Sequence, residues 1–247
     1  MMDSITYAPV GDSAVTAVFG NTIAIDINHR IRRTVQLLTD AAPDGIEELV
    51  PTYCSLLVAY NPLVLSYDKV CEIIATAAAT PDDNTSERTV RVIEIPTLYG
   101  GDYGPDLEFV SRHAGLSADE VVKRHSRPDY PVYMLGFIPG FAYLGGMDES
   151  IAAPRLSSPR THVPKGSVGI ANTQTGVYPT VSPGGWQLIG RTPIELYDEL
   201  KAQPALLQAG DYVHYAPITE EEYLAIQADV DNYVVKTYVK KESELCE

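Results

Sequence analysis

The sequence predicts an α+β protein of two parts, a small N-terminal α+β sandwich followed by a glycine-rich, barrel-like domain. One observation is the repeated order of strand and helix patterns in the first 80 residues. Another is a polar segment without periodicity at 80–88. The third is the central stretch 131–193, which holds 10 of the 18 glycines, 8 of the 18 prolines and the single tryptophan.

Strand patterns and helix patterns alternate in the N-terminal part. We expect strands at 5–10, 14–19, 46–51 and 53–60, because each is a short run of branched, aromatic or apolar residues beside a turn signal. Apolar residues recur at helical spacing over 27–38 and 70–78, so a helix should follow each strand pair. This order is that of a small α+β sandwich.

The polar segment 80–88, TPDDNTSER, predicts a boundary between one domain at 1–84 and another at 85–247. A strand at 89–95 should open the second domain. Pro105 and Asp106 suit the first turn of a helix that stops at Gly115, and Ser117 with Glu120 forms a capping-box pattern for the next helix. A closing strand before Thr219 and a helix capped by Thr219 complete the pattern.

The charge balance argues against several classes of partner. The chain carries 18 Lys and Arg against 33 Asp and Glu, a formal charge of −15. Nucleic acid and anionic membrane surfaces are bound by clustered cations, so we expect neither partner. No apolar run reaches the roughly 18 residues of a membrane span, and the N-terminus shows no secretory pattern. These features predict a cytoplasmic protein.

The cysteines point to reduced thiols rather than to a metal site. Cys54, Cys71 and Cys246 are odd in number and lack metal-ligand spacing. We therefore expect no metal.

The central stretch has a charge opposite to that of the whole chain. Its cations are Arg155, Arg160, Lys165 and Arg191, and its carboxylates are Asp148 and Glu149, a local balance of +2. Guanidinium groups on rigid loops suit bidentate binding of carboxylate or phosphate, and Arg155 and Arg160 each follow a proline. The pattern predicts a pocket for an anionic small molecule. The alternative is that each arginine pairs with a structural carboxylate or a loop carbonyl.

Aromatic residues are the second feature of this stretch. Tyr133, Phe137, Phe141, Tyr143 and Trp186 are suited to line a cleft, and the alternative for Phe137 and Phe141 is the core of a barrel. Two glycines, Gly184 and Gly185, precede Trp186, which predicts a loop that approaches something closely. Gln187 beside it offers both a donor and an acceptor.

His125 lies near the C-terminal end of the second predicted helix of this domain. The helix dipole there favours an imidazolium, which suits an acid–base or ligand role. The alternative is a surface histidine that caps the last carbonyls. Phosphate loops, dinucleotide-binding glycine motifs, HExxH and GxSxG are all absent from the sequence. On their own, the residues indicate an anion-binding globular protein.

Three ordered motifs resemble the allophanate-hydrolase-subunit-1 family. They are GFIPGFAYLGGMD at 136–148, PRLSSPRTHVPKGSVGIANTQTGVYP at 154–179 and SPGGWQLIGRTP at 182–193. YGGDYGPDLE at 99–108 and GDSAV at 11–15 fit the same family, and the match extends to about Ile218. Members include the B subunit of the bacterial ATP-dependent 5-oxoprolinase and the inhibitor of a sporulation histidine kinase. One half of the carboxyltransferase domain of urea amidolyase is also similar.

The resemblance implies a cyclophilin-like β-barrel for the C-terminal domain and ring opening of 5-oxo-L-proline to L-glutamate, driven by ATP. It implies a companion A subunit, a related C subunit, and ATP that is bound in the complex. We assign catalytic roles to His125, Arg155 and Arg160. Substrate binding is assigned to Tyr133, Phe137, Phe141, Tyr143, Lys165, Gly184, Gly185, Trp186, Gln187 and Arg191. Lys165 and the pair Asn172-Thr173 depart from many relatives, which implies a different ligand preference if Lys165 points into the pocket.

Two other functions stay open on the same resemblance. The chain would inhibit a sensor histidine kinase in one, and would form half of a urea- or allophanate-pathway carboxyltransferase in the other. The chain contains no biotin-attachment motif.

Overall fold

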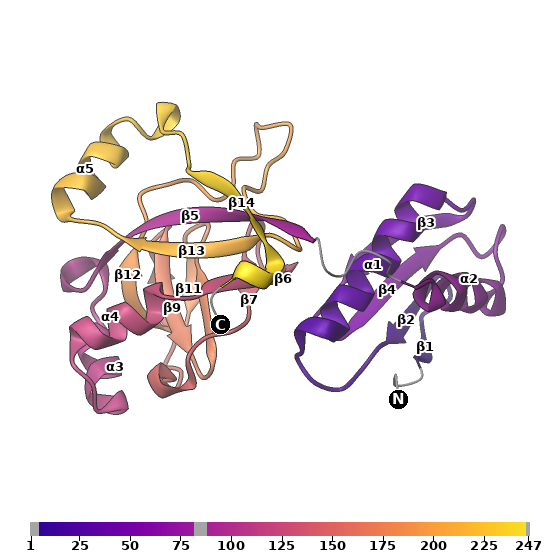
Figure 1. The fold of residues 1–247 in the computed structure, drawn as a ribbon, viewed down its shortest axis with the longest axis horizontal. Coiled ribbons are helices and arrows are strands. Elements are labelled where there is room, and N and C mark those ends of the chain that lie inside the picture. The colour runs from indigo at the N-terminus through magenta and orange to yellow at the C-terminus, as the bar shows by residue number, and fades with distance from the viewer. Residues whose placement is uncertain (1–4, 82–87, 246–247) are drawn as a thin grey trace. The chain divides into compact units, whose positions relative to one another are not determined.

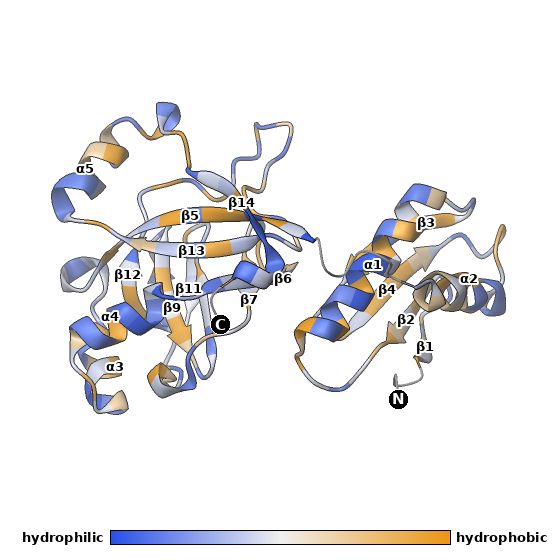
Figure 2. Ribbon diagram, in the orientation of Figure 1, coloured by the Kyte–Doolittle hydropathy of each residue, from blue (hydrophilic) through white to orange (hydrophobic). Residues whose placement is uncertain are grey.

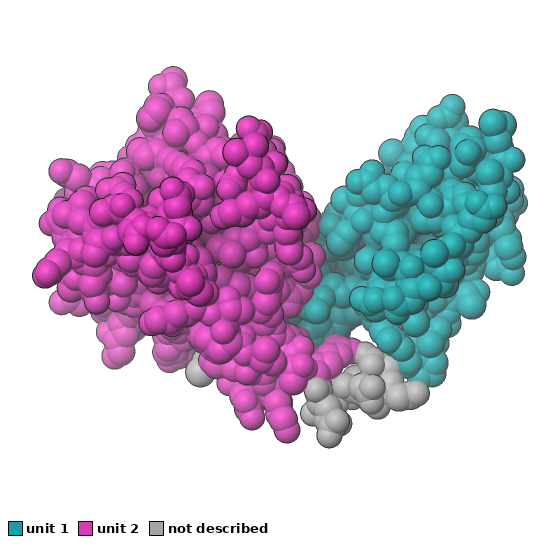
Figure 3. All heavy atoms as spheres, turned by 90° about the horizontal axis from the view of Figure 1, so that it is seen from above, with its two compact units in different colours: residues 1–85 teal, residues 86–247 magenta. Residues whose placement is uncertain are grey.

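The computed structural model describes residues 5–81 and 88–245. The chain divides into two compact units, 1–85 and 86–247, which Figure 3 colours teal and magenta. The boundary expected between 84 and 85 falls within 82–87, outside the described residues, as does Cys246. Cys54 and Cys71 are free thiols.

The first unit is a four-stranded antiparallel sheet with two helices (Figure 1). Its elements are β1 Thr6–Val10, β2 Ala14–Val18, α1 Ile25–Ala41, β3 Ile46–Pro51, β4 Ser55–Tyr60 and α2 Tyr67–Ala79. The strand order is β1-β2-β4-β3. These elements correspond to the strands and helices that the sequence predicts for this part of the chain.

Side-chain alternation places one face of this sheet against the helices. Val15 on β2 and its register partner Val58 on β4 are both fully buried. They pack in one cluster with Ile31 of α1 and Ile74 of α2, which are also fully buried. Burial of one such side chain stabilises the fold by roughly 1.5–3 kcal/mol. The Ser66 side chain caps α2 by accepting from the backbone N–H of Lys69.

The second unit is a curved sheet with helices beside it. Its strands are β5 Thr89–Tyr99, β6 Asp129–Leu135, β7 Ala142–Leu144, β8 Arg160–Val163, β9 Ser167–Ala171, β10 Gln174–Val177, β11 Ser182–Gly184, β12 Gln187–Arg191, β13 Tyr212–Pro217 and β14 Thr237–Lys241. Its α-helices are α3 Leu107–Ala114, α4 Ala118–Ser126 and α5 Glu220–Ala228. Short 3₁₀ turns are η1 Gly101–Tyr103, η2 Glu149–Ile151, η3 Val230–Asn232 and η4 Glu242–Glu244.

The sheet order is β10-β9-β12-β5-β13-β6-β7, with β14 added to β5 and with β8 and β11 paired separately. The β5–β13 pair is parallel and the other pairs are antiparallel. The two ends of the order, β10 and β7, also lie close together, so the sheet nearly closes on itself. The predicted fold class, α+β with a barrel-like second part, is confirmed.

The core of the second unit lies inside this curved sheet. Ile93 and Ile95 of β5 stand opposite Val213 and Tyr215 of β13, and all four are fully buried. In Figure 2 the middle of β5 and β13 is correspondingly hydrophobic, whereas α4 shows hydrophilic segments. Among the described residues no helix is long and apolar enough to cross a membrane.

The loop after β5 approaches β12 so closely that one position must be glycine. A Cβ on Gly104 would lie 2.1 Å from the Ile189 carbonyl oxygen. This contact brings the start of α3 onto β12, where the Asp106 backbone N–H donates to the Leu188 carbonyl at 2.8 Å. As the sequence predicts, α3 ends at Gly115, in a left-handed conformation with φ 67°.

We predict that Gly104→Ala destabilises the second unit by about 1–3 kcal/mol, because the backbone of β12 has to move to admit the methyl group. Urea denaturation followed by circular dichroism measures the change. Gly185→Ala is the control, since a Cβ there would lie an ordinary 3.6 Å from Pro159. Equal stability of the two variants would contradict the close approach.

Candidate functional site

Aromatic side chains from three segments meet beside β11 and β12. Phe141, which directly precedes β7, lies 5.9 Å from the Tyr178 ring and 5.7 Å from the Trp186 ring, both edge to face. Tyr143 joins them with its ring 5.2 Å from Phe141. Phe141, Tyr178 and Trp186 are buried. We call these four residues the aromatic cluster; it contains three of the predicted substrate-binding aromatics.

Gly184, the first of the two glycines before Trp186, packs closely against this cluster. A Cβ on Gly184 would lie 2.4 Å from the Tyr178 hydroxyl oxygen, so the loop does make the close approach expected from its sequence. Gly185 has ordinary space around it. The Gln187 side-chain amide is 2% exposed and donates to the Pro154 carbonyl at 2.8 Å, which ties β12 to the residue before Arg155. Gln187 therefore positions the segment that carries Arg155.

Arg155 is the exposed cation of this surface. Its guanidinium carbon lies 6.0 Å from the centre of the Trp186 ring, within the range of a cation–π contact. Burial raises the pKa of the Tyr178 phenol, while the positive charges of Arg155 and Arg160 act on it in the opposite direction. Both arginines therefore lie close enough to Tyr178 for their charges to act on its hydroxyl.

Arg160 is held by a carboxylate that the sequence did not reveal. Its Nη2 donates to both oxygens of Asp106, at 2.7 and 2.8 Å, and its Nη1 donates to the Trp186 carbonyl at 3.3 Å. One Asp106 oxygen also accepts from the Leu188 backbone N–H at 2.6 Å. For Arg160 the alternative considered from the sequence, pairing with a structural carboxylate, describes the contact observed.

Asp106 was assigned from the sequence to the first turn of a helix. It does occupy the N-cap position of α3, but its side chain makes no capping hydrogen bond. The carboxylate instead turns to β12 and Arg160. Its position, directly after the Gly104-Pro105 corner that packs on β12, is the signal that could have identified it.

We predict that Asp106 and Arg160 are energetically coupled. Their side chains are only 13% and 29% exposed, so removing either partner leaves a partly buried charge without its counterion. A double-mutant cycle of Asp106→Asn and Arg160→Ala should give a coupling free energy of roughly 1–3 kcal/mol in urea unfolding. Additive effects of the two substitutions would show that the pair contributes no stability.

The remaining predicted cations contact other residues. Lys165 pairs with Glu195, and the Arg191 guanidinium lies 5.5 Å from the Tyr103 ring in the η1 turn. Tyr133 is buried, and its ring packs closely on Gly145, where a Cβ would lie only 2.1 Å from a ring carbon. These direct contacts associate Lys165, Arg191 and Tyr133 with structural neighbours outside the aromatic cluster.

Phe137 lies at the edge of the cluster. Its ring is 6.0 Å from the Phe141 ring. Phe137 is 71% exposed, whereas Phe141, Tyr178 and Trp186 are buried. The barrel-core alternative therefore holds for Phe141, which is buried, and not for Phe137.

His125 differs most from its sequence-based expectation. It is 0% exposed and lies among the rings of Tyr99, Tyr130 and Tyr215 at centroid distances of 5.7, 5.7 and 4.5 Å. Burial lowers the pKa of its imidazole to about 3. The expected imidazolium is wrong because desolvation outweighs the helix dipole at this depth. The alternative, a surface histidine that caps carbonyls, is wrong because the ring is fully buried and its nitrogens contact Tyr99 and Thr175.

The hydrogen-bond partners of His125 determine which of its ring nitrogens donates and which accepts. The Thr175 hydroxyl donates to the Gly169 carbonyl at 3.1 Å, so it accepts from Nε2–H of His125 at 2.7 Å. Nδ1 of the neutral ring is then an acceptor for the Tyr99 hydroxyl at 2.8 Å. The chain Tyr99, His125, Thr175, Gly169 links β5, α4, β10 and β9 through the core.

We predict that this buried histidine makes the second unit sensitive to acid. Because the unfolded state takes up a proton near pH 6.5 and the folded state only near pH 3, stability is full above pH 6.5 and falls as pH decreases between these values. The slope is at most about 1.4 kcal/mol per pH unit from this residue. Urea unfolding of wild type and His125→Asn from pH 7 to 4.5 should show the smaller slope in the variant.

His113→Gln serves as the control for that experiment, because it removes an exposed histidine of α3. Imidazole NMR titration of the wild-type protein gives the same test without a substitution. A His125 signal that titrates near pH 6.5 would refute the assignment.

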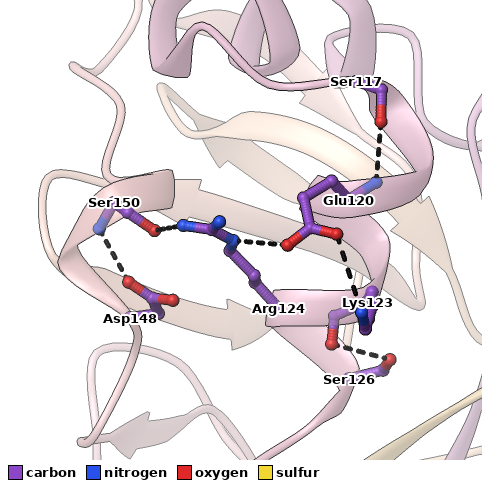
Figure 4. A network of polar contacts seen from close by, with 7 residues as sticks. All are labelled: Ser117, Glu120, Lys123, Arg124, Ser126, Asp148 and Ser150. Carbon is purple, nitrogen blue, oxygen red and sulfur yellow. Dashed lines mark hydrogen bonds and ion pairs between the residues drawn. The ribbon is translucent and has the colours of Figure 1, made fainter.

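A surface network fixes the loop after β7 to α4 (Figure 4). Arg124 of α4 donates from Nε to Glu120 at 2.9 Å and from Nη1 to the Ser150 hydroxyl at 2.7 Å. Asp148 caps the η2 turn by accepting from the Ser150 backbone N–H at 2.9 Å. Both carboxylates counted in the central stretch, Asp148 and Glu149, therefore belong to this turn.

A cavity of about 450 Å³ lies between the segment after β12 and the segment after α5. Ile194, Leu206 and Tyr233 contribute apolar side chains to it, and Arg91 and Glu195 are among its charged lining residues. Arg91 pairs with Asp211, which is not among the lining residues. The cavity lining includes none of the residues predicted for the site.

Arg155 and Arg160 place two guanidinium groups, which suit anions chemically, beside the aromatic cluster. Arg155 offers an exposed guanidinium above an aromatic ring, and Arg160 is oriented by Asp106. Within 5–81 and 88–245, no group of three or more His, Cys, Asp or Glu residues is placed to hold a metal ion.

Fold and sequence together define a carboxyltransferase-type module. Residues 5–207 match the family model described as the carboxyltransferase domain, subdomain C and D, and the chain belongs to this family. The resemblance seen in the ordered motifs is thereby confirmed.

Two bacterial relatives share this module over almost their whole length. The chain is 41% identical over 230 residues to the B subunit of 5-oxoprolinase from Bacillus subtilis, a match that covers 89% of this chain and 95% of the relative. It is 40% identical over 211 residues to the B subunit of 5-oxoprolinase from Escherichia coli O157:H7, covering 85% and 95%.

Solved structures share the fold. A conserved uncharacterized protein from Pyrococcus horikoshii has 47% sequence identity and a TM-score of 0.53, covering 88% of this chain and 100% of that one. Urea amidolyase of K. lactis has a TM-score of 0.79 at 20% identity, covering 97% of this chain and 16% of that one. The second comparison shows a common fold inside a much longer protein.

Proposed function

We propose that the chain is the B subunit of a bacterial ATP-dependent 5-oxoprolinase, which converts 5-oxo-L-proline and ATP to L-glutamate, ADP and phosphate. The observation that carries the proposal is the 40–41% identity to two proteins named as the B subunit of 5-oxoprolinase, across 95% of their length. That name implies a complex of several subunits. The proposed partners are an A subunit and a related C subunit.

The chemistry of the reaction suits a cationic surface. The lactam of 5-oxoproline is resonance-stabilised, so its carbonyl carbon is a poor electrophile until the carbonyl oxygen is phosphorylated. The transferred phosphoryl group is anionic, as is the substrate carboxylate, and both are stabilised by positioned cations. Arg155 and Arg160 are the cations that lie against the aromatic cluster.

The two arginines are proposed to have different roles. Arg155 is exposed and would bind an anionic group of the substrate or of ATP directly. Arg160 already donates two hydrogen bonds to Asp106, so it would act from a fixed position. His125 is neutral and enclosed by tyrosines, and we propose that it positions β10 and α4 rather than exchanging protons with substrate.

ATP is proposed to bind in the assembled complex. This sequence contains no phosphate loop of the GxxxxGK[ST] kind, and the described cations near the cluster are few. A site completed by a second subunit would supply the remaining cations. Gly184, Gly185, Trp186 and Gln187 are proposed to shape the wall of that site.

The test is reconstitution from the purified chain and the A and C subunits of the same organism, followed by ATP-dependent release of glutamate from 5-oxo-L-proline. We expect activity only when all subunits are present. Unchanged activity without this chain would end the proposal. Inhibition of a sensor histidine kinase stays an alternative, and a kinase autophosphorylation assay with the same preparation tests it.

The urea- or allophanate-pathway function also stays an alternative. Biotin-dependent carboxyl transfer by the reconstituted proteins would favour it over ring opening. The K. lactis similarity concerns the fold alone.

We predict that Arg155→Ala lowers turnover of the reconstituted complex ten-fold or more and the unfolding free energy of the chain by at most about 1 kcal/mol, because the residue is exposed and loses only its cation–π contact with Trp186. Arg160→Ala should lower both turnover and stability, since it also removes the Asp106 pair. Arg112→Ala, an exposed arginine of α3, is the control and should change neither. Wild-type kinetics in Arg155→Ala would assign this arginine no role in the reaction.

A further inference from the structure

Phe137 combines a disfavoured backbone conformation with an exposed aromatic ring. Its φ is +68°, a region that bulky side chains rarely adopt. The Ile138 backbone N–H donates to the Gly136 carbonyl at 2.9 Å, so Phe137 is the central residue of a γ-turn of the positive-φ kind, which is rare and strained. The residue is 71% exposed.

Hydrogen bonds within the loop hold Phe137 in this conformation. Gly136 N–H donates to the Phe141 carbonyl at 3.0 Å, and Phe141 N–H donates to the Ile138 carbonyl at 3.1 Å. These bonds close the connection between β6 and β7 around Phe137. A strained residue persists where its surroundings over-determine it, and such residues cluster at functional sites.

Two other described residues with a side chain have positive φ, and both have a local explanation. Ala42 is the left-handed C-cap of α1, and its N–H donates to the Leu38 carbonyl. Asn172 lies in the tight turn between β9 and β10, and asparagine tolerates this conformation. Phe137 has neither explanation, and its exposed ring recovers little packing energy inside this chain.

Location and charge indicate what covers the ring. It lies beside the aromatic cluster, where Arg155 is exposed, whereas Arg160 and Lys165 are paired with Asp106 and Glu195. Small substrates are bound in concave pockets, whereas a ring at the tip of a rigid loop is typical of an aromatic anchor in a protein interface. Arg155 contacts the Trp186 ring, and both Trp186 and Phe137 contact Phe141, so an acidic partner surface that covers this cluster would complement the charge of Arg155.

We propose that Phe137 is an anchor for the C subunit of the proposed complex, inserting into an apolar pocket that carries carboxylates at its rim. The inference rests on the proposed function for the identity of the partner, and it moves Phe137 from substrate binding to subunit contact. The γ-turn holds the ring in the orientation used on association, so little conformational freedom is lost when the subunits meet.

The test compares Phe137→Gly and Phe137→Ala with Val181→Ala, a matched control that truncates another exposed apolar side chain, 54% exposed, in the same stretch. Isothermal titration calorimetry with the purified C subunit of the same organism should show a dissociation constant raised at least ten-fold in both Phe137 variants. Val181→Ala should bind like wild type.

Thermal unfolding tests the strain separately. Both Phe137 variants lack the ring, but only glycine adopts positive φ freely, so the glycine variant should melt about 2–4 °C above the alanine variant. Equal melting temperatures would refute the strained turn.

The outcomes also separate this inference from the proposed function. A ring-dependent association without 5-oxoprolinase activity would keep the anchor and reject the function. Wild-type affinity for the C subunit in both Phe137 variants, or no association of the wild-type chain, would overturn the anchor. So would loss of 5-oxo-L-proline binding by the Phe137 variants alone with association intact, because the ring would then belong to the substrate site.

Discussion

The Asp106 carboxylate joins three segments that are far apart in the sequence. It accepts from Arg160 at the start of β8 and from the Leu188 backbone of β12, while its own residue begins α3. The Trp186 carbonyl accepts from the same arginine, so the loop that carries Trp186 is fixed by this pair as well. A carboxylate with this many charge-assisted bonds orients an arginine more firmly than aromatic packing does. The orientation of Arg160 therefore depends on a residue that carries the opposite charge.

The His125 hydrogen-bond chain plays the equivalent part inside the sheet. Polar groups buried this deeply are tolerated because each has a partner, and the donor direction leaves only the neutral tautomer of the ring. The same four-residue chain connects β5, α4, β10 and β9, which come from distant parts of the sequence. The residues that fix the geometry of the core, such as His125 and Thr175, are thus different from the exposed residue at the aromatic cluster, Arg155.

Local patterns predicted the elements well, because capping residues, periodicity and glycine stops act over a few residues. Thr219 forms a complete capping box with Glu222, and α3 stops at Gly115. The candidate site was predicted as a stretch of sequence, and three of its five aromatic residues, Phe141, Tyr143 and Trp186, do meet in one cluster. What the sequence could not provide were partners far along the chain. Asp106 stands 54 residues from Arg160, and His125 stands 50 residues from Thr175. Only folding decides whether an arginine is exposed or paired, and whether a histidine lies on the surface or in the core.

The parallel pairing of β5 with β13 has a consequence for how the protein is made. β5 ends at Tyr99, but its neighbours β13 and β14 begin at Tyr212 and Thr237. On a ribosome, both of these neighbours are therefore synthesised more than a hundred residues after β5. Contacts this distant in sequence form slowly, and an unpaired apolar strand is prone to aggregate meanwhile. Synthesis rate and chaperone supply should therefore limit the yield of this unit more than its final stability does.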